Sequence, residues 1–518
     1  MIQPRFQPDK YAEGRTLFVI GLLLLCGLGC FWRFWGLDPP SLWLDDQWVA
    51  IVVSKMTWRQ FIQLRPPVPI GFVAVLKLLA SFLSDPEWPL QVFPAACSIL
   101  QLPLLALLVV RATGRRSLGL LAAALLLVNP TVGTYAVRVK PFASDSLITI
   151  LILLAGLPLL QRWTARRAVV VAATGIVALL FSFTSAFVSL PLLNLAVARR
   201  LLQGKDKAVR WRAISIGLAF NAAALLLYCV LLRGQSNDAM KAFWADFFLP
   251  LESAGAAFAF LYSQVLGALI GGAFPGPGWF LAGLLLIPPC AILIREPATR
   301  NSVMLFPLFY CSLAAASALH VYPVGTGRTD IFSYPITLLL LCLGLHVLTP
   351  WIGLGKYAGM VFVVLALVVV MRYGAASAYK KPCDDAQLVA SLQRLAQDDD
   401  AVVIYPHGSF AVGYYSEWPM QIRPWDQYTH GFEVQFERQP TLTLRGYTDL
   451  PTNPERLGAD LDRLLAARHQ RIFYLAAYFH LPAHKFVHER IERAGYQAVD
   501  NIKAPPAQLI EYNAKSAR

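Results

Sequence analysis

Long apolar runs separated by short polar loops dominate the first 373 residues of the chain. A run of about 20 apolar residues is enough for a helix to cross a bilayer, and tilting accommodates other lengths. The pattern therefore predicts a polytopic α-helical membrane protein with about 11 transmembrane helices. The expected spans are residues 16–37, 88–110, 117–136, 142–160, 168–183, 184–198, 213–232, 279–294, 302–320, 332–348 and 357–373.

Basic residues in the loops orient these spans. With the spans counted as above, all the basic clusters and the amino terminus fall on one side of the bilayer, which the positive-inside rule assigns to the cytosol. The clusters lie at 111–116, 162–167, 199–212 and 295–300.

Two further apolar stretches, 68–83 and 256–273, are ambiguous in composition. If either crossed the membrane alone, basic clusters after it would move to the outer side, against the same rule. We therefore expect both to form exoplasmic helices that lie on the membrane or dip into it. The alternative is that both cross as ordinary spans.

The region 374–518 differs in kind from the apolar part. Strand-like runs such as AVVIYP, RIFYLAAYF and QLIEYN alternate with amphipathic helix-like stretches, which predicts a small α/β domain. We expect a transmembrane module, 1–373, with its first exoplasmic loop at 38–87. A soluble exoplasmic (periplasmic) α/β domain, 374–518, follows it.

The composition agrees with a membrane protein and raises one further class. Of the 518 residues, 57% are hydrophobic and 15% charged, and the net charge is +14. Such a positive charge can indicate nucleic-acid binding, but many of these Lys and Arg residues lie in short loops where they orient the spans. We therefore expect no nucleic-acid partner. The eight cysteines show no CxxC or metal-type spacing, so no cysteine metal site is implied.

Two adjacent acids, Asp45 and Asp46, follow the first apolar run in the stretch SLWLDDQWVA. They stand between Trp43 and Trp48, so their surroundings at the membrane interface are partly apolar. A carboxylate there can have a raised proton affinity or hold a divalent cation. A solvated turn, with Asp as a helix N-cap, is the alternative.

Two other loops that are expected on the outer side contain charged residues, and their cations run against the positive-inside bias. Arg138, Lys140 and Asp145 lie in YAVRVKPFASDSL, and Arg328 lies in HVYPVGTGRTDIFSYP. A guanidinium at this depth can grip a phosphate with two hydrogen bonds. Arg138 could instead snorkel to the interface and Arg328 could be an interface anchor.

Acids in one outer loop and phosphate-binding cations in two others suit one kind of chemistry. Cations can neutralise the phosphate of a lipid-linked group, and a carboxylate can take the proton from an attacking hydroxyl. The pattern thus favours transfer of a group from a lipid phosphate in the outer leaflet to a hydroxyl.

The three motifs LWLDDQW, VRVKPFASDSL and YPVGTGRTDIFSYP resemble those of the GT-C superfamily of integral-membrane glycosyltransferases. The resemblance is to the family related to protein O-mannosyltransferases and lipid A aminoarabinose transferases, and it covers roughly residues 15–350. It implies Asp45 as the catalytic base and Arg328 as a ligand of the donor phosphate. Asp46 would be a metal or acceptor ligand, although family members often carry Glu at this position.

The same resemblance implies further candidate residues, the substrates and the cellular location. Lys140 and Arg138 would assist at the donor phosphate, with Asp145 and Tyr322 as other candidates. The donor would be a polyprenyl-phosphate sugar, and the enzyme an inverting hexosyl- or pentosyltransferase of the bacterial inner membrane, with a divalent metal as a possible cofactor. The acceptor would be an exoplasmic glycan, lipid or protein.

Two other functions remain open. A transporter or flippase of lipid-linked saccharides needs ionisable residues inside its spans, and the spans here are nearly free of them. A ligase of O-antigen type would be expected to carry its main loop late in the chain, whereas the acid-rich loop here is the first. The aromatic stretches at 405–419 and 423–432 leave sugar binding, acceptor docking or a structural cap open for the C-terminal domain.

Overall fold

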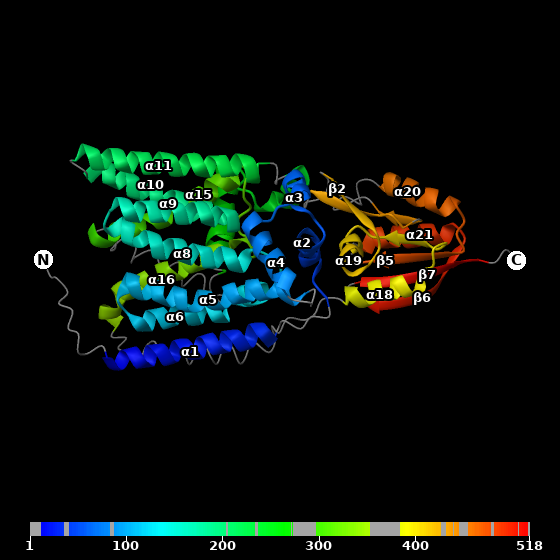
Figure 1. Cartoon of the computed structure of the whole chain (residues 1–518), viewed down its shortest axis with the longest axis horizontal. Helices are drawn as coiled ribbons and strands as arrows, with labels where there is room; N and C mark the ends of the chain where they lie inside the picture. The colour runs from blue at the N-terminus through cyan, green and yellow to red at the C-terminus, as the bar shows by residue number, and fades with distance from the viewer. Residues whose placement is uncertain are drawn as a thin grey trace.

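The computed structural model shows a helical bundle and an α/β domain stacked along one long axis (Figure 1). The bundle lies at one end of this axis and the α/β domain at the other. The structure describes residues 12–35, 41–82, 87–203, 206–233, 237–270, 272, 297–352, 384–425, 431–438, 440–444, 454–477, 481–505 and 507–515. The expected spans 279–294 and 357–373 lie outside these residues.

Each of the other expected spans except 117–136 coincides with a single bundle helix. The helices are α1 (Ala12–Trp35), α5 (Trp88–Thr113), α6 (Arg116–Val128), α8 (Phe142–Gln161), α9 (Ala165–Phe181), α10 (Ala186–Gln203), α11 (Lys207–Leu227), α15 (Pro297–Ala318) and α16 (Tyr334–Ile352). Within the described residues, six helical segments are long and apolar enough to cross a membrane. A multi-pass helical membrane architecture is thus confirmed, and the total of about 11 spans stays a prediction.

The expected span 117–136 is in fact two helices, because Asn129 and Pro130 interrupt it. Helix α6 ends before Asn129, whose side chain accepts a hydrogen bond from the Val132 N–H and caps α7 (Pro130–Tyr135). Proline suits the first helical position, where its missing N–H costs nothing, but it cannot continue a preceding helix. The Asn–Pro pair therefore ends one helix and starts the next.

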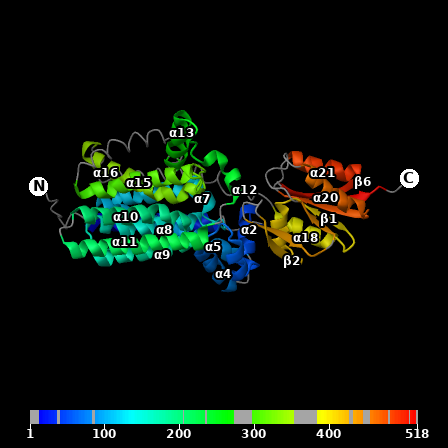
Figure 2. The same cartoon turned by 90° about the horizontal axis from the view of Figure 1, so that it is seen from above.

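The first loop forms three short helices at the end of the bundle that faces the α/β domain (Figure 1), and Figure 2 shows two of them, α2 and α4, from above. They are α2 (Leu44–Ser54), α3 (Trp58–Leu64) and α4 (Ile70–Phe82). A capping box between Thr57 and Gln60 starts α3, and Arg65 ends it in the left-handed conformation at φ 47°. The apolar stretch 68–83 is thus the 13-residue helix α4, shorter than a span of about 20 residues.

The loop after α11 contains further short helices. A π-helical turn, η3 (Tyr228–Leu232), extends α11, and α12 (Asp238–Phe243) and η4 (Ala245–Phe247) follow. The described part of the stretch 256–273 lies mostly in α13 (Ala254–Phe260) and the π-helix η5 (Leu261–Ile270). A 3-10 turn, η7 (Thr329–Ser333), leads into α16.

The C-terminal region is an α/β domain, as the sequence predicts. Its five-stranded sheet has the order β4-β1-β5-β7-β6, with β1 parallel to β4 and β5, and β7 antiparallel to β5 and β6. The strands are β1 (Ala401–Ile404), β4 (Thr441–Thr443), β5 (Arg471–Ala476), β6 (Tyr496–Ala504) and β7 (Ala507–Ala514), and β2 (Met420–Pro424) pairs with β3 (Phe432–Phe436). The helices are α18 (Asp385–Leu395), α19 (Gly408–Tyr415), α20 (Pro454–Ala466) and α21 (Leu481–Arg493).

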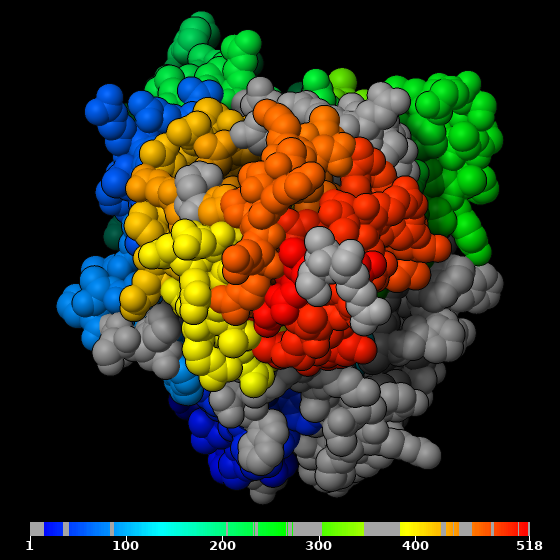
Figure 3. All heavy atoms as spheres, turned by 90° about the vertical axis from the view of Figure 1, so that its right-hand side faces the viewer, coloured from blue at the N-terminus to red at the C-terminus, as the bar shows by residue number. Residues whose placement is uncertain are grey.

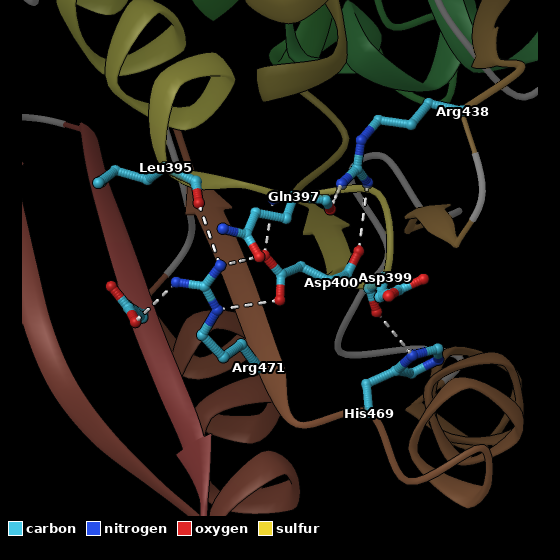
Figure 4. Close-up of polar contacts among 8 residues, drawn as sticks. Leu395, Gln397, Asp399, Asp400, Arg438, His469 and Arg471 are labelled. Atoms are coloured by element: carbon cyan, nitrogen blue, oxygen red, sulfur yellow. Dashed lines mark hydrogen bonds and ion pairs between the residues drawn. The ribbon is translucent and has the colours of Figure 1, made fainter.

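Two arginines, one of them on β5, form hydrogen bonds with the turn between α18 and β1 (Figure 4). Arg471 of β5 donates two hydrogen bonds to Asp400, at 3.0 and 2.7 Å. Arg438 donates to the carbonyl oxygens of Asp400 and Gln397 on the same turn. These contacts join the turn before β1 to β5 and to the segment after β3.

The two faces of the sheet bury different partners. Alternate residues of a strand point to opposite faces. Val403 accordingly packs in a core with α20 and α21, whereas Val402 and Ile404 pack in a core that also contains α18, α19 and buried residues of α2 and α4. The first-loop helices and the α/β domain therefore share one hydrophobic core, and the domain covers the end of the bundle (Figure 3).

Candidate active site

The two acids of the first loop lie in the first turn of α2 and have different surroundings. Trp43 occupies the N-cap position without a side-chain cap, so neither Asp is the N-cap. Asp46 is 2% exposed, and its Oδ2 accepts a hydrogen bond from Arg138 Nη1 at 3.1 Å. Asp45 keeps 31% of its side chain exposed and accepts a hydrogen bond from Arg328 Nη1 at 2.8 Å. One acid is therefore a buried anchor, and the other is accessible.

Two cations come from the turn before α8 and rest on tryptophans of the first loop. The Arg138 guanidinium lies 4.9 Å from the centroid of the Trp43 ring. Lys140 Nζ lies 4.0 Å from that of Trp48. Both cations are buried. Because an aromatic face attracts a cation, the tryptophans that frame the acids also hold the positive charges beside them.

The third cation, Arg328, stands on a glycine-rich loop held by its own hydrogen bonds. Asp330 accepts bonds from the backbone N–H groups of Gly325 and Gly327, at 3.3 and 2.9 Å. These glycines have φ of 86° and 79°, a left-handed conformation that favours glycine. The Tyr322 hydroxyl donates to the Thr329 carbonyl at 2.8 Å. The loop is thus fastened on both sides of Arg328.

Two residues beside Arg328, Trp244 and Asp330, are not among the candidates predicted from the sequence. Trp244 lies in the loop after α11, and the Arg328 guanidinium is 4.9 Å from its ring centroid. The aromatic run AFWADFF was a signal for it. Asp330 closes the GTGRTD stretch, where an acid after two glycines indicates a turn held by its side chain. Both residues position Arg328.

We call Asp45, Asp46, Arg138, Lys140 and Arg328 the ionic cluster. Their formal charges do not sum to zero. Arg138, Lys140 and Arg328 carry three positive charges against the two carboxylates, so the formal net charge is one positive. Burial lowers the pKa of Lys140 to about 8, an effect that Asp45 and Asp46 partly oppose. Burial also raises the pKa of Asp46, which Arg138 and Lys140 counter. A positive, partly exposed cluster of this kind can bind an anion.

Asp145 and Tyr322, two further candidates, stand apart from the ionic cluster. Asp145 is buried in the first turn of α8, next to Ser182. Tyr322 is committed to the loop that carries Arg328. The structure therefore brings together five of the predicted residues, namely Asp45, Asp46, Arg138, Lys140 and Arg328.

Side chains of the α/β domain form hydrogen bonds with the amino-terminal end of α2. Gln47 Nε2 donates to Asp385 Oδ2 at 2.5 Å and to the Leu42 carbonyl at 2.8 Å. The Tyr415 hydroxyl accepts from the Leu42 N–H at 2.5 Å and donates to Glu87 at 2.7 Å. These contacts, which we call the α2 clamp, lie on both sides of the two acids in the chain.

The acids and their neighbours do not fit a divalent cation. Such an ion needs several oxygen ligands, but Asp45 and Asp46 are each paired with an arginine. In the described part of the chain, no group of three or more His, Cys, Asp or Glu side chains is arranged to hold a metal. The ion pair of Asp46 with Arg138 therefore does not fit the metal role that the resemblance implies for Asp46.

The fold is similar to that of ArnT from Cupriavidus metallidurans. The structure of ArnT bound to undecaprenyl phosphate is 12% identical with a TM-score of 0.52, covering 98% of this chain and 99% of that one. The apo structure is 13% identical with the same TM-score, covering 97% and 98%. The arabinofuranosyltransferase AftD from Mycobacteria is 15% identical with a TM-score of 0.50, over 97% of this chain and 42% of its own.

Sequence comparison alone gives no relative. No model of a known protein family matches the chain, and no curated protein matches it significantly. The likeness lies in the three-dimensional arrangement and extends over nearly the whole length of ArnT. The chain therefore shares its overall fold with ArnT and AftD.

Proposed function

We propose that the protein transfers a sugar from a polyprenyl-phosphate donor to a hydroxyl of an exoplasmic glycan, lipid or protein. One observation carries the proposal: an accessible carboxylate, Asp45, pairs with Arg328 inside a cluster of three cations. The expected proton acceptor, Asp45, is thus in contact with the expected phosphate ligand, Arg328.

The donor phosphate would take the place of the Asp45 carboxylate on Arg328. A phosphate oxygen pair can accept two hydrogen bonds from one guanidinium, and Lys140 adds a nearby positive charge. Asp46 stays buried and keeps Arg138 in position. Donor binding therefore frees Asp45 from its ion pair at the moment when a base is needed.

The freed Asp45 would then act on the acceptor. Its carboxylate takes the proton of the acceptor hydroxyl while that oxygen attacks the anomeric carbon of the sugar. The bond between the sugar and the phosphate oxygen breaks, and the lipid phosphate leaves with the bonding electrons. The cations stabilise the charge that grows on the phosphate. A single displacement of this kind inverts the anomeric configuration.

We place the protein in the bacterial inner membrane, with about 11 spans and with the ionic cluster and the 374–518 domain in the periplasm. Helix α5 runs away from the first-loop helices, so its last turn with Arg111 lies at the far end of the bundle. The basic residues at 111–116, 162–167 and 199–212 would then face the cytosol.

A flippase or a ligase of lipid-linked saccharides is the alternative. A flippase needs a polar path through the bilayer. Two charged residues buried in described span helices are Arg33 and Asp145. Arg33 lies two residues from the end of α1, and Asp145 lies in the first turn of α8. Both positions are at the end of the bundle near the acids, so they favour a site there and not a path across.

The purified chain in lipid nanodiscs is expected to break the donor's sugar–phosphate bond. Incubation with polyprenyl phosphate carrying a radiolabelled sugar, plus envelope extract from cells lacking the gene, should move the label from the lipid to the extract. A flippase leaves the labelled lipid intact. Retention of all label on the lipid, across donors with different sugars, would exclude the proposed transfer.

Donor use is expected to weaken as the pH rises above about 8, because Lys140 has its pKa near that value and loses its positive charge there. The ratio kcat/KM for the donor, measured from pH 6 to 10, should fall through this region. The variant Lys140→Arg should move the fall to higher pH, since arginine stays charged. An unchanged profile in Lys140→Arg would show that another group titrates.

A further inference from the structure

A second feature of the molecule lies at the other end of α2, where the first loop meets the α/β domain. A cavity of about 270 Å³ opens there. Helix α3 and strand β2, which contribute to it, lie side by side (Figure 1). Its lining consists of Lys55, Gln60, Gly413, Ser416, Glu417, Trp418, Met420 and Ile422. We call it the interface groove.

The groove offers hydrogen-bonding groups that are not used inside the protein. Lys55 and Glu417 are exposed, and within the described chain neither forms an ion pair or a side-chain hydrogen bond. Gln60 uses its carbonyl oxygen in the capping box with Thr57, which leaves its amide N–H groups to a ligand. A carboxylate, an ammonium and an amide together can serve the neighbouring hydroxyls of a sugar, which both donate and accept.

An aromatic ring completes the lining. Trp418 is half-buried, and it is fixed by an edge-on contact with Phe436 and by the Arg438 guanidinium, 5.0 Å from its ring centroid. A rigid aromatic wall with a few placed polar groups is the usual composition of a small-molecule site. The volume is near the lower end of such sites, about 300 Å³, which suits one or two sugar rings and excludes a folded protein segment.

The groove lies at the opposite end of α2 from Asp45 and Asp46. Lys55 follows Asp45 by ten residues along α2, a distance of about 15 Å at 1.5 Å per residue. A short oligosaccharide can span this distance, and a monosaccharide cannot. On the basis of the proposed function, we infer that the interface groove binds a saccharide unit of the acceptor, several units away from the hydroxyl that reacts.

The inference is tested by binding, which does not need turnover. The probe is the oligosaccharide mixture released by mild acid from the envelope of cells lacking the gene. Saturation-transfer NMR with the full chain in nanodiscs should show contact with these sugars. The double variant Lys55→Met/Glu417→Gln is expected to bind about tenfold more weakly, because it loses hydrogen bonds to two charged groups.

Two further variants separate loss of the groove from loss of folding and from loss of catalysis. Lys485→Met, at an exposed lysine of α21, should bind like the unaltered chain. Asp45→Asn should also bind normally, since Asp45 lies outside the groove. Equal binding by the double variant and the unaltered chain, or absence of binding by the unaltered chain, overturns the inference. If instead the groove variants lose binding while Asp45→Asn keeps its transfer rate, the groove stands and the proposed catalytic role fails.

Discussion

Asp45→Asn is expected to lower kcat for sugar transfer by about 10²-fold or more, the usual scale for a general base. The amide keeps the size of the carboxylate but cannot take the proton of the acceptor hydroxyl. The change also removes the carboxylate that holds Arg328. Because that carboxylate competes with the donor phosphate, KM for the donor should not rise. The measurement is initial-rate kinetics with the purified variant, varying each substrate in turn.

Controls distinguish this result from a general loss of structure. Asp238→Asn changes an acid of the loop after α11 whose side chain is fully exposed, and it should leave the kinetics unaltered. Asp46→Asn leaves Arg138 without its buried partner, so we expect reduced amounts of folded protein in addition to slower transfer. Near-normal kcat in Asp45→Asn would exclude Asp45 as the base.

Arg328→Ala is expected to lower kcat/KM for the donor by about ten- to a hundredfold, the scale of a lost charge-assisted contact of ~1.5–3 kcal/mol. The guanidinium would grip the phosphate with two hydrogen bonds and stabilise the charge that grows on it. KM for the acceptor should change little. Arg328→Lys should recover part of the loss, since it keeps the charge but not the planar fork.

An anchoring role for Arg328 makes a different prediction. Its contact with the Trp244 ring could stabilise the loop alone, in which case the Ala variant would be less abundant but kinetically normal. Donor titrations on purified protein separate the two roles. Arg65→Ala is a suitable control, because this exposed arginine at the end of α3 donates a hydrogen bond to the Arg233 carbonyl. Normal donor kinetics in Arg328→Ala would move the phosphate site to Arg138 and Lys140.

The sequence predicts the helices of the bundle well, because a bilayer demands long apolar runs and the chain supplies them. It also predicts the α/β character of the C-terminal region from the alternation of strand-like and helix-like stretches. It does not predict the break at Asn129 from hydrophobicity, since the apolar run continues on both sides. The helix ends there for a local reason, the cap and the proline.

The candidate residues of the site were visible in the sequence, but their pairing was not. Asp46 meets Arg138 across 92 positions, and Asp45 meets Arg328 across 283. Neighbouring residues on a helix point about 100° apart, so the two acids meet different surroundings. Which one is buried depends on how α2 is packed, and that depends on the α/β domain.

The α2 clamp has a consequence for the order in which the protein matures. The two acids are synthesised within the first fifty residues, whereas Asp385 and Tyr415 come hundreds of residues later. The sheet of their domain is complete only with β7, which ends at Ala514. Until those strands have paired, the start of α2 lacks the groups that hold it. The earliest loop to be synthesised is thus among the last to reach its final shape, and a chain still growing carries its two acids before the surroundings of α2 are complete.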